Sequence, residues 1–333
     1  MTNSTKDDPA GPRARILSRG FSGLPFWLLL ITAAGLRAQA TTVAIDHEVK
    51  IQYDLAGEQL PVWSGGSLLT FVSNQTPAPA ILAFDDKGAQ RLPWVITIPE
   101  SETVDLRDVA SGRDGTIVAC GLAYDHAGKG SRFLAILTPN GGKATVVRLS
   151  PYVAERVTVA SDGTVWTAGL EITNAMDSTP PASGVIRHFD RTGKMIAGFI
   201  PRSSFSSPFM VQYGMLRSAQ GRIGWYTGPN TGPGSQYYEI LADGAVRKYP
   251  MIPLGNTARV NGLALTDDGR TYVTMRDQAN HIRQCLFTAG PHQKWTSLPL
   301  PGPLSKAFLY GAEGVELVFS RDRFTFTFGN VSN

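Results

Sequence analysis

A tight-turn signal repeats six times along the chain, and it constrains the fold more than any other feature of the sequence. Each copy ends in a glycine that follows a polar residue or another glycine, at the end of an alternating apolar run. The copies are Gly65-Gly66, Asp114-Gly115, Asp162-Gly163, Gln220-Gly221, Asp268-Gly269 and Glu313-Gly314. They recur about every 50 residues, which is typical of proteins built from repeated supersecondary units.

Each repeat contains four short segments with strand character, for example residues 108–111, 116–123, 132–138 and 144–150. These segments are rich in β-branched and aromatic residues, turn residues separate them, and no helical period is evident. Four strands in roughly 40 to 50 residues is the pattern of one propeller blade. The sequence therefore predicts an all-β fold, a six-bladed β-propeller. A long β-sandwich is the alternative, but it would not require so regular a repeat.

The last repeat is incomplete, since only residues 315–320 and 323–328 have strand character after its turn. Val49, Ile51, Tyr53 and Leu55 alternate with polar residues, as in a half-buried strand. We expect this N-terminal strand to close the last blade, because closure removes an exposed sheet edge.

The N-terminus has the pattern of a secretory signal peptide. Three arginines precede an apolar run over residues 24–35, and Ala38-Gln39-Ala40 supplies a small-residue cleavage site. We expect a signal peptide over residues 1–40 and a mature propeller over residues 41–333, exported to the periplasm or the extracellular space. Membrane insertion is not expected after cleavage, although retention of the segment as an anchor is the open alternative.

The charge of the mature chain argues against a nucleic-acid partner. The whole chain has 31 basic and 27 acidic residues, but residues 1–40 hold five of the basic and two of the acidic ones. The remainder is close to neutral and shows no basic cluster. Cys120 and Cys285 fall in blades that would lie opposite each other, so we expect two unpaired thiols.

The longer connections predict the face on which a partner binds. In an up-and-down blade, residues 124–131, 173–184, 201–212 and 228–235 fall on the face away from the repeated turns. Loops on a rigid scaffold commonly carry binding sites. The partner, whether a small molecule, a glycan or a protein, is not identified by these residues.

Six residues share one register, seven positions before each turn, at the predicted mouth of the central channel. They are Glu58, Arg107, Glu155, Tyr213, Asn261 and Lys306. Asp108 and Arg156 lie one position deeper. Polar groups that converge on one opening predict a ligand-binding site. The alternative is a set of ion pairs that plug the channel, Arg107 with Glu155 and Lys306 with Glu58.

One stretch resembles a known family of propellers. Residues 261–273, Asn-Gly-Leu-Ala-Leu-Thr-Asp-Asp-Gly-Arg-Thr-Tyr-Val, resemble the innermost hairpin of the gluconolactonase and regucalcin family, and residues 157–167 and 108–119 are similar to NHL repeats. The resemblance implies that Asn261 would bind a divalent metal together with a Glu from the first blade and an Asp from the blade after Asn261. Lys306 stands where the acidic ligand would be needed, so we predict no metal site.

The functional prediction is a binding or scaffold propeller, because no complete catalytic motif is present. The alternative is a metal-dependent, lactonase-like hydrolase or lyase that acts at the channel mouth. The sequence leaves open whether the protein is an enzyme, and it identifies neither catalytic residues nor a cofactor.

Overall fold

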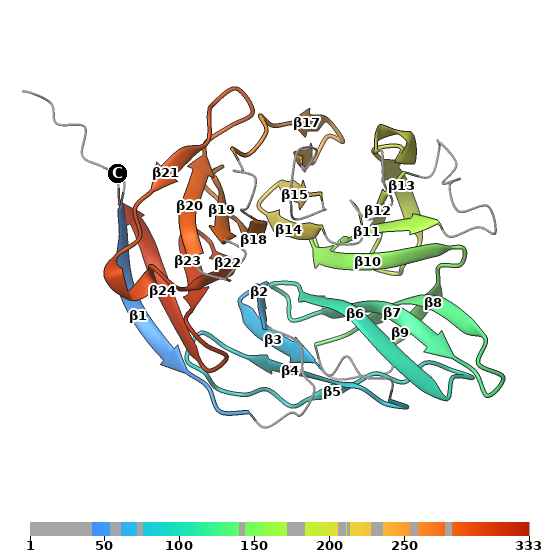
Figure 1. Cartoon of the computed structure of the whole chain (residues 1–333). Coiled ribbons are helices and arrows are strands. Elements are labelled where there is room, and N and C mark those ends of the chain that lie inside the picture. Colours follow the sequence, from blue (N-terminus) through green and yellow to red (C-terminus); the bar gives the residue numbers. More distant parts are fainter. Residues whose placement is uncertain are drawn as a thin grey trace, which may run out of the picture. The chain divides into compact units, whose positions relative to one another are not determined.

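The computed structural model describes residues 42–53, 61–71, 76–139, 144–171, 184–205, 211, 214–227, 236–253, 259–276 and 282–332. These residues form six antiparallel four-stranded sheets, each built from strands that are neighbours along the chain or meet at its two ends. The first strand of each sheet contacts the first strands of the sheets on either side, so the six sheets close into a ring (Figure 1). The fold is a six-bladed β-propeller, as predicted.

The blades are numbered in chain order. Blade 1 contains β2 (Val62–Ser64), β3 (Ser67–Phe71), β4 (Ala80–Phe84) and β5 (Trp94–Val95). Blade 2 contains β6 (Thr103–Ser111), β7 (Ile117–Tyr124), β8 (Gly130–Leu137) and β9 (Thr145–Arg148). Blade 3 contains β10 (Tyr152–Val159), β11 (Val165–Glu171), β12 (Ile186–Phe189) and β13 (Met195–Phe199). Blade 4 contains β14 (Met215–Ala219), β15 (Arg222–Tyr226), β16 (Tyr237–Leu241) and β17 (Val246–Lys248). Blade 5 contains β18 (Arg259–Leu265), β19 (Thr271–Arg276), β20 (Ile282–Thr288) and β21 (Thr296–Leu298). Blade 6 contains β22 (Phe308–Glu313), β23 (Glu316–Ser320), β24 (Thr325–Ser332) and β1 (Thr42–Lys50).

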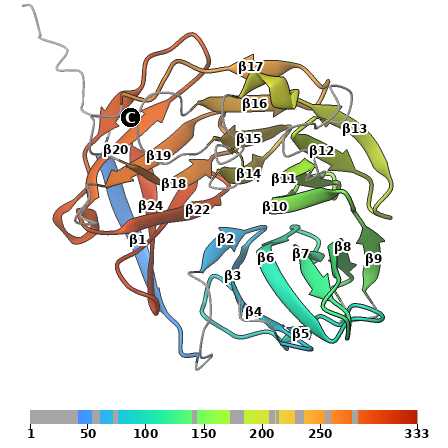
Figure 2. The same cartoon turned by 45° about the vertical axis from the view of Figure 1, so that its right-hand side comes forward.

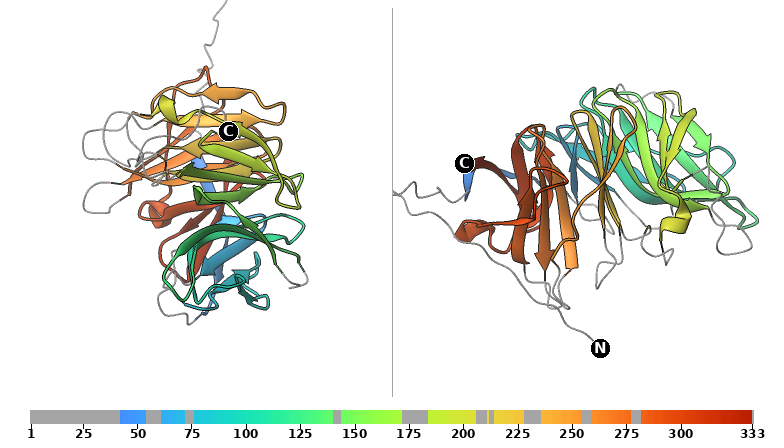
Figure 3. Two further views of the ribbon diagram at one scale, coloured as in Figure 1. Left: turned by 90° about the vertical axis from the view of Figure 1, so that its right-hand side faces the viewer. Right: turned by 90° about the horizontal axis from the view of Figure 1, so that it is seen from above.

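Two short 3₁₀ helices lie outside the blades. They are η1 (Arg202–Ser204) and η2 (Gly302–Leu304). Figures 2 and 3 show the same succession of sheets from other sides, from the blue and cyan strands of blade 1 through green and yellow to the red strands of blade 6.

The N-terminal strand closes blade 6, as expected, but it begins earlier than predicted. β1 pairs antiparallel with β24, with Val49 opposite Phe326. Only Val43 and Val49 are buried along this outermost strand, so its first part shows no apolar alternation. The predicted strand therefore overlaps β1 only at Val49 and Lys50, because Ile51 and Tyr53 lie beyond its end and Leu55 lies outside the described residues. The predicted signal peptide, residues 1–40, also lies outside them.

The first strand of blade 2 begins at Thr103, five residues before the predicted start. A β-bulge at Arg107 interrupts the pairing of β6 with β7 between Leu106 and Asp108. The extra residue reverses the inward and outward alternation of side chains. Val104 and Leu106 are buried, but they fall out of phase with the apolar residues that follow the bulge.

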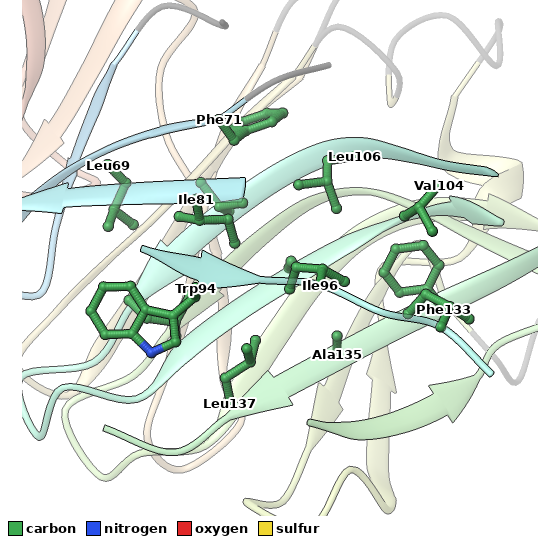
Figure 4. Packing of buried hydrophobic residues seen from close by; sticks show 14 of the residues in the cluster. Leu69, Phe71, Ile81, Trp94, Ile96, Val104, Leu106, Phe133, Ala135 and Leu137 are labelled. Atoms are coloured by element: carbon green, nitrogen blue, oxygen red, sulfur yellow. The ribbon is translucent and has the colours of Figure 1, made fainter. Parts of the chain in front are cut away.

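Six hydrophobic clusters lie between neighbouring blades and hold the ring together. In the cluster between blades 1 and 2, Leu69 and Ile81 face Phe133 and Leu137 across the gap between the two sheets (Figure 4). Equivalent clusters fill each of the other five gaps. The core of the protein is therefore a set of interfaces between sheets.

Both cysteines are free and buried, which confirms the prediction of unpaired thiols. Cys120 lies on β7 in the cluster between blades 2 and 3, and Cys285 lies on β20 in the cluster between blades 5 and 6. Burial raises the pKa of the Cys285 thiol to about 12. Both thiols are thus core side chains.

One of the predicted long loops is a tight turn. Residues 125–129 connect β7 to β8, and the Asp125 Oδ1 accepts hydrogen bonds from the Ala127 and Lys129 N–H groups, both at 2.9 Å. The run of polar residues at this position reflects a compact turn rather than an irregular loop. Residues 173–183, 206–210, 212–213 and 228–235 lie outside the described residues, so the predicted binding face remains a prediction.

Candidate functional site

Three of the predicted site residues share a β-bulge. Arg107, Glu155 and Asn261 are each the extra residue in the first strand of their blade, where pairing is interrupted between Leu106 and Asp108, Ala154 and Arg156, and Val260 and Gly262. Bulges bend a strand and redirect a side chain, and they are frequent beside functional sites. The common register of these three residues is therefore real, whereas their role in binding remains a prediction.

The structure brings Arg107 and Glu155 into one charged group. Arg107 Nη2 lies 3.3 Å from the Asp105 carboxylate of its own strand, and it also interacts electrostatically with Glu155 of blade 3. Burial raises the pKa of Glu155, while Arg107 and then Arg156 act to lower it. Among the described residues, the ion pair of Arg107 is therefore with Asp105, and Glu155 of the next blade is a second acidic group that interacts with it.

Asn261 has a side-chain amide without a hydrogen-bond partner. Both its Oδ1 and its Nδ2 are buried and unpartnered, and so is the hydroxyl of Thr274 on the neighbouring strand β19. Buried polar groups nearly always have partners, so a group without one needs an explanation. This amide is the least satisfied of the predicted site residues that the structure describes.

Of the other three predicted residues, the structure describes Lys306 alone. Lys306 is exposed and lies between η2 and β22, outside the strand. The bulged residue of β22 is Tyr310, whose ring packs against Phe308 and Phe326. Glu58 and Tyr213 lie outside the described residues.

Hairpin length explains why the offset of seven residues failed for Lys306. Five residues connect the first two strands in blades 2, 3 and 5, whereas two residues connect them in blades 1, 4 and 6. Counting back seven residues from the turn therefore reaches the bulged residue only in the blades with the five-residue hairpin. A shorter offset in blade 6 would have selected Tyr310.

The offset also missed Arg217 of β14, the first strand of blade 4. Arg217 and Arg156 both interact electrostatically with Asp108 of β6. Burial raises the pKa of Asp108, and the two arginines oppose this shift. The hairpin at Gln220-Gly221 has two residues. An offset shortened to match this hairpin could have reached Arg217.

The hairpin end of the channel is almost closed. A cavity of about 40 Å³ lies there, lined by residues from the first hairpin of every blade. These include Gly65, Arg113, Ser161, Gln220, Asp267 and Glu313. Arg113 and Asp267 form an ion pair of 2.6 Å between blades 2 and 5. This volume has room for only a few water molecules, so a larger molecule does not fit at this end.

Within the described ranges, no group of three or more His, Cys, Asp or Glu side chains is arranged to hold a metal ion. No helix in the described part of the chain is long and apolar enough to cross a membrane.

Comparisons with known proteins show no close relative. No protein-family model matches the chain, and no curated protein sequence matches it. Among solved structures, a glucose dehydrogenase superposes with a TM-score of 0.46 and 12% identity, covering 86% of this chain and 100% of that one. A catalytically inactive variant of virginiamycin B lyase from Staphylococcus aureus, solved with quinupristin, superposes with a TM-score of 0.45 and 11% identity, covering 86% of this chain and 99% of that one. The assignment of the fold rests on the strand pairing described above.

Proposed function

We propose that this protein is an exported binding propeller that holds a small ligand in its central channel, with Asn261 among the contacts. The observation that carries the proposal is the Asn261 amide, which is buried with both polar atoms unpartnered. Leaving such a group unsatisfied costs about 1–3 kcal/mol. A ligand that pairs with the amide would remove this cost.

The shape of the channel supports entry from one side. The first hairpins of all six blades line the small cavity at their end of the channel. Of the bulged residues, Glu155 and Asn261 lie nearer to the other end of their strands, and Arg107 lies at the middle of β6. The ligand would therefore enter from the face away from the hairpins, and the pattern of residues 1–40 supports export.

Asn261→Leu tests the proposal, because leucine has a similar volume and no polar group. We expect the free energy of unfolding of the ligand-free protein to stay the same or rise, while a ligand found by thermal-shift screening no longer binds. Asn330→Leu is the matched control. Asn330 Nδ2 donates a hydrogen bond to Glu316 at 3.0 Å, so this substitution should lower stability.

Equal destabilisation by the two substitutions would contradict the proposal, since Asn261 would then have a structural partner such as an ordered water. The lactonase-like alternative also involves Asn261. The effect of calcium chloride on the melting temperature distinguishes this alternative from ligand binding without a metal. A rise in melting temperature with calcium that disappears in Asn261→Leu would favour the metal-dependent alternative.

A further inference from the structure

Two arginines approach one carboxylate inside the ring. Arg156 of β10 and Arg217 of β14 both interact electrostatically with Asp108 of β6, and these three strands are the first strands of consecutive blades. Asp108 is anchored to blade 3, because its Oδ2 accepts the Val157 N–H at 2.9 Å. The position of the carboxylate is thus fixed by the backbone of the next blade.

The two guanidinium groups bind backbone carbonyls instead of this carboxylate. Arg156 donates from Nε to the Gly214 carbonyl at 2.7 Å and from Nη1 to its neighbour Glu155 at 2.5 Å. Arg217 donates from Nη1 to the Leu216 carbonyl at 2.8 Å, and its Nε is buried without a partner. Among the described residues, neither guanidinium forms an ion pair with a carboxylate. One donor of Arg217 therefore has no partner within the protein.

Asp108 alone does not balance the two positive charges of Arg156 and Arg217. The wider group is balanced in number, since Arg107 pairs with Asp105 and Glu155 interacts with Arg107 and, less strongly, with Arg156. Neither Arg156 nor Arg217 has a direct carboxylate partner within this group. A positive charge that is partly removed from water and lacks a direct partner favours the binding of an anion.

We infer that the channel takes a ligand that carries a carboxylate, bound by the guanidinium groups of Arg156 and Arg217. Guanidinium groups match the planar geometry of a carboxylate, and charge-assisted hydrogen bonds are stronger than neutral ones. The inference rests on the proposed function, because it names the ligand class for the same channel. Asp108 attracts both arginines electrostatically and so limits their affinity for the anion.

Simple probes test the charge requirement. Succinate and acetate should bind in calorimetry at constant ionic strength, whereas their neutral counterparts succinamide and acetamide should not. Arg217→Gln should weaken succinate binding by about tenfold or more. Asp108→Asn should strengthen it, because the substitution removes a competing negative charge and leaves an oxygen that can accept the Val157 N–H. The second variant keeps the test decisive if Arg217→Gln folds poorly.

Arg113→Gln is the control, since it makes the same change of charge at the hairpin end of the channel, where Arg113 pairs with Asp267. It should leave succinate binding unchanged. The inference is overturned if none of the carboxylates binds, if succinamide binds as well as succinate, or if Arg217→Gln binds succinate like the wild type. If a neutral or cationic compound binds to the protein, and Asn261→Leu abolishes this binding while Arg217→Gln does not, the proposed function stands but the ligand does not carry a carboxylate. If no compound of any charge binds, both fail.

Discussion

Arg113 and Asp267 form an ion pair across the ring, with Arg113 Nη2 2.6 Å from Asp267 Oδ2. The two residues belong to the first hairpins of blades 2 and 5, which lie opposite each other. The second carboxylate oxygen of Asp267 accepts the Gln220 N–H of blade 4 at 2.9 Å, and its own N–H donates to the Gly314 carbonyl of blade 6 at 2.7 Å. One aspartate thus links four of the six blades.

We expect Asp267→Ala to lower the free energy of unfolding by about 1–3 kcal/mol, because it removes charge-assisted hydrogen bonds and leaves the Gln220 N–H unpaired. Arg113→Ala should cost less, about 0–1 kcal/mol, since half of the Arg113 side chain is exposed and exposed ion pairs contribute little. Urea denaturation of both variants measures the difference. Equal losses would mean that Asp267 acts through the ion pair alone.

The same aspartate should make stability depend on acidic pH. Burial acts to raise the pKa of Asp267, but hydrogen bonds from Arg113 and from the Gln220 N–H outweigh it, and the pKa lies below its usual value. A lowered pKa in the folded state contributes stability above the unfolded pKa of about 3.9, and this contribution is lost as the pH falls through the folded pKa. Between about pH 5 and pH 3, the wild type should therefore lose more stability than Asp267→Asn. Parallel pH profiles would contradict this.

Gly121 and Gly169 should tolerate no side chain. They lie opposite the bulges at Arg107 and Glu155, and a Cβ would come within 2.2 Å of the Asp105 carbonyl oxygen at Gly121 and within 2.0 Å of the corresponding oxygen of Val153 at Gly169. Alanine at either position should cost about 1–3 kcal/mol or more, because the strand would have to move.

Gly290→Ala is the control for these substitutions, since a Cβ at Gly290 meets nothing within 4 Å. We expect a change within about 0.5 kcal/mol there. Thermal or urea unfolding compares the three variants. A loss at Gly290 as large as that at Gly121 or Gly169 would show that steric contact at the bulge is not the cause.

Glu239 is the centre of a buried polar network between blades 4 and 5. Only 2% of the residue is exposed, and its carboxylate accepts hydrogen bonds from Arg222 at 2.5 Å, Tyr237 at 2.9 Å, Tyr249 at 2.5 Å and Thr271 at 3.0 Å. Glu239→Leu should cost about 3–5 kcal/mol, because it leaves the buried Arg222 without its counter-charge. Tyr249→Phe removes one hydrogen bond and should cost about 0.5–3 kcal/mol.

A double substitution separates the charge from the packing in this network. Adding Arg222→Leu to Glu239→Leu should restore part of the lost stability, since no unpaired charge then remains. A double variant less stable than Glu239→Leu would show that Arg222 stabilises the fold chiefly through its hydrogen bonds to the Thr266 and Arg270 carbonyls.

The fold could be predicted because its turns depend on a local property. The glycines at positions 66, 115, 163, 221, 269 and 314 all have a positive φ, which other residues adopt at a cost. The sequence of every blade therefore contains the turn signal, and the length of the repeat follows from the spacing of these turns. The closing strand was harder to delimit, since only Val43 and Val49 of β1 are buried.

The shared position of the candidate site residues could be predicted only where local geometry repeats. Arg107, Glu155 and Asn261 share an offset because their blades have five-residue hairpins, and Lys306 does not because blade 6 has a two-residue hairpin. The pairing of Arg113 with Asp267 could not be predicted, since it depends on the width of the channel. Contacts across the ring are set by the packing between all the blades, which no single repeat encodes.

The closing strand gives the last prediction. β1 covers β24, where the His47 ring stacks on Phe328 at 4.3 Å between centroids and Val49 pairs with Phe326. Deleting residues 42–50 would leave the backbone edge of β24 unpaired and uncover two aromatic side chains that are now 1–2% exposed. Exposed apolar edges of this kind promote association. We expect a lower melting temperature for the whole ring and oligomers in size-exclusion chromatography. A synthetic peptide of residues 41–53 should restore the monomer by pairing with β24, as added strands do in other sheets, whereas a scrambled peptide should not. A deletion variant that stays monomeric and as stable as the parent would show that blade 6 does not depend on its fourth strand.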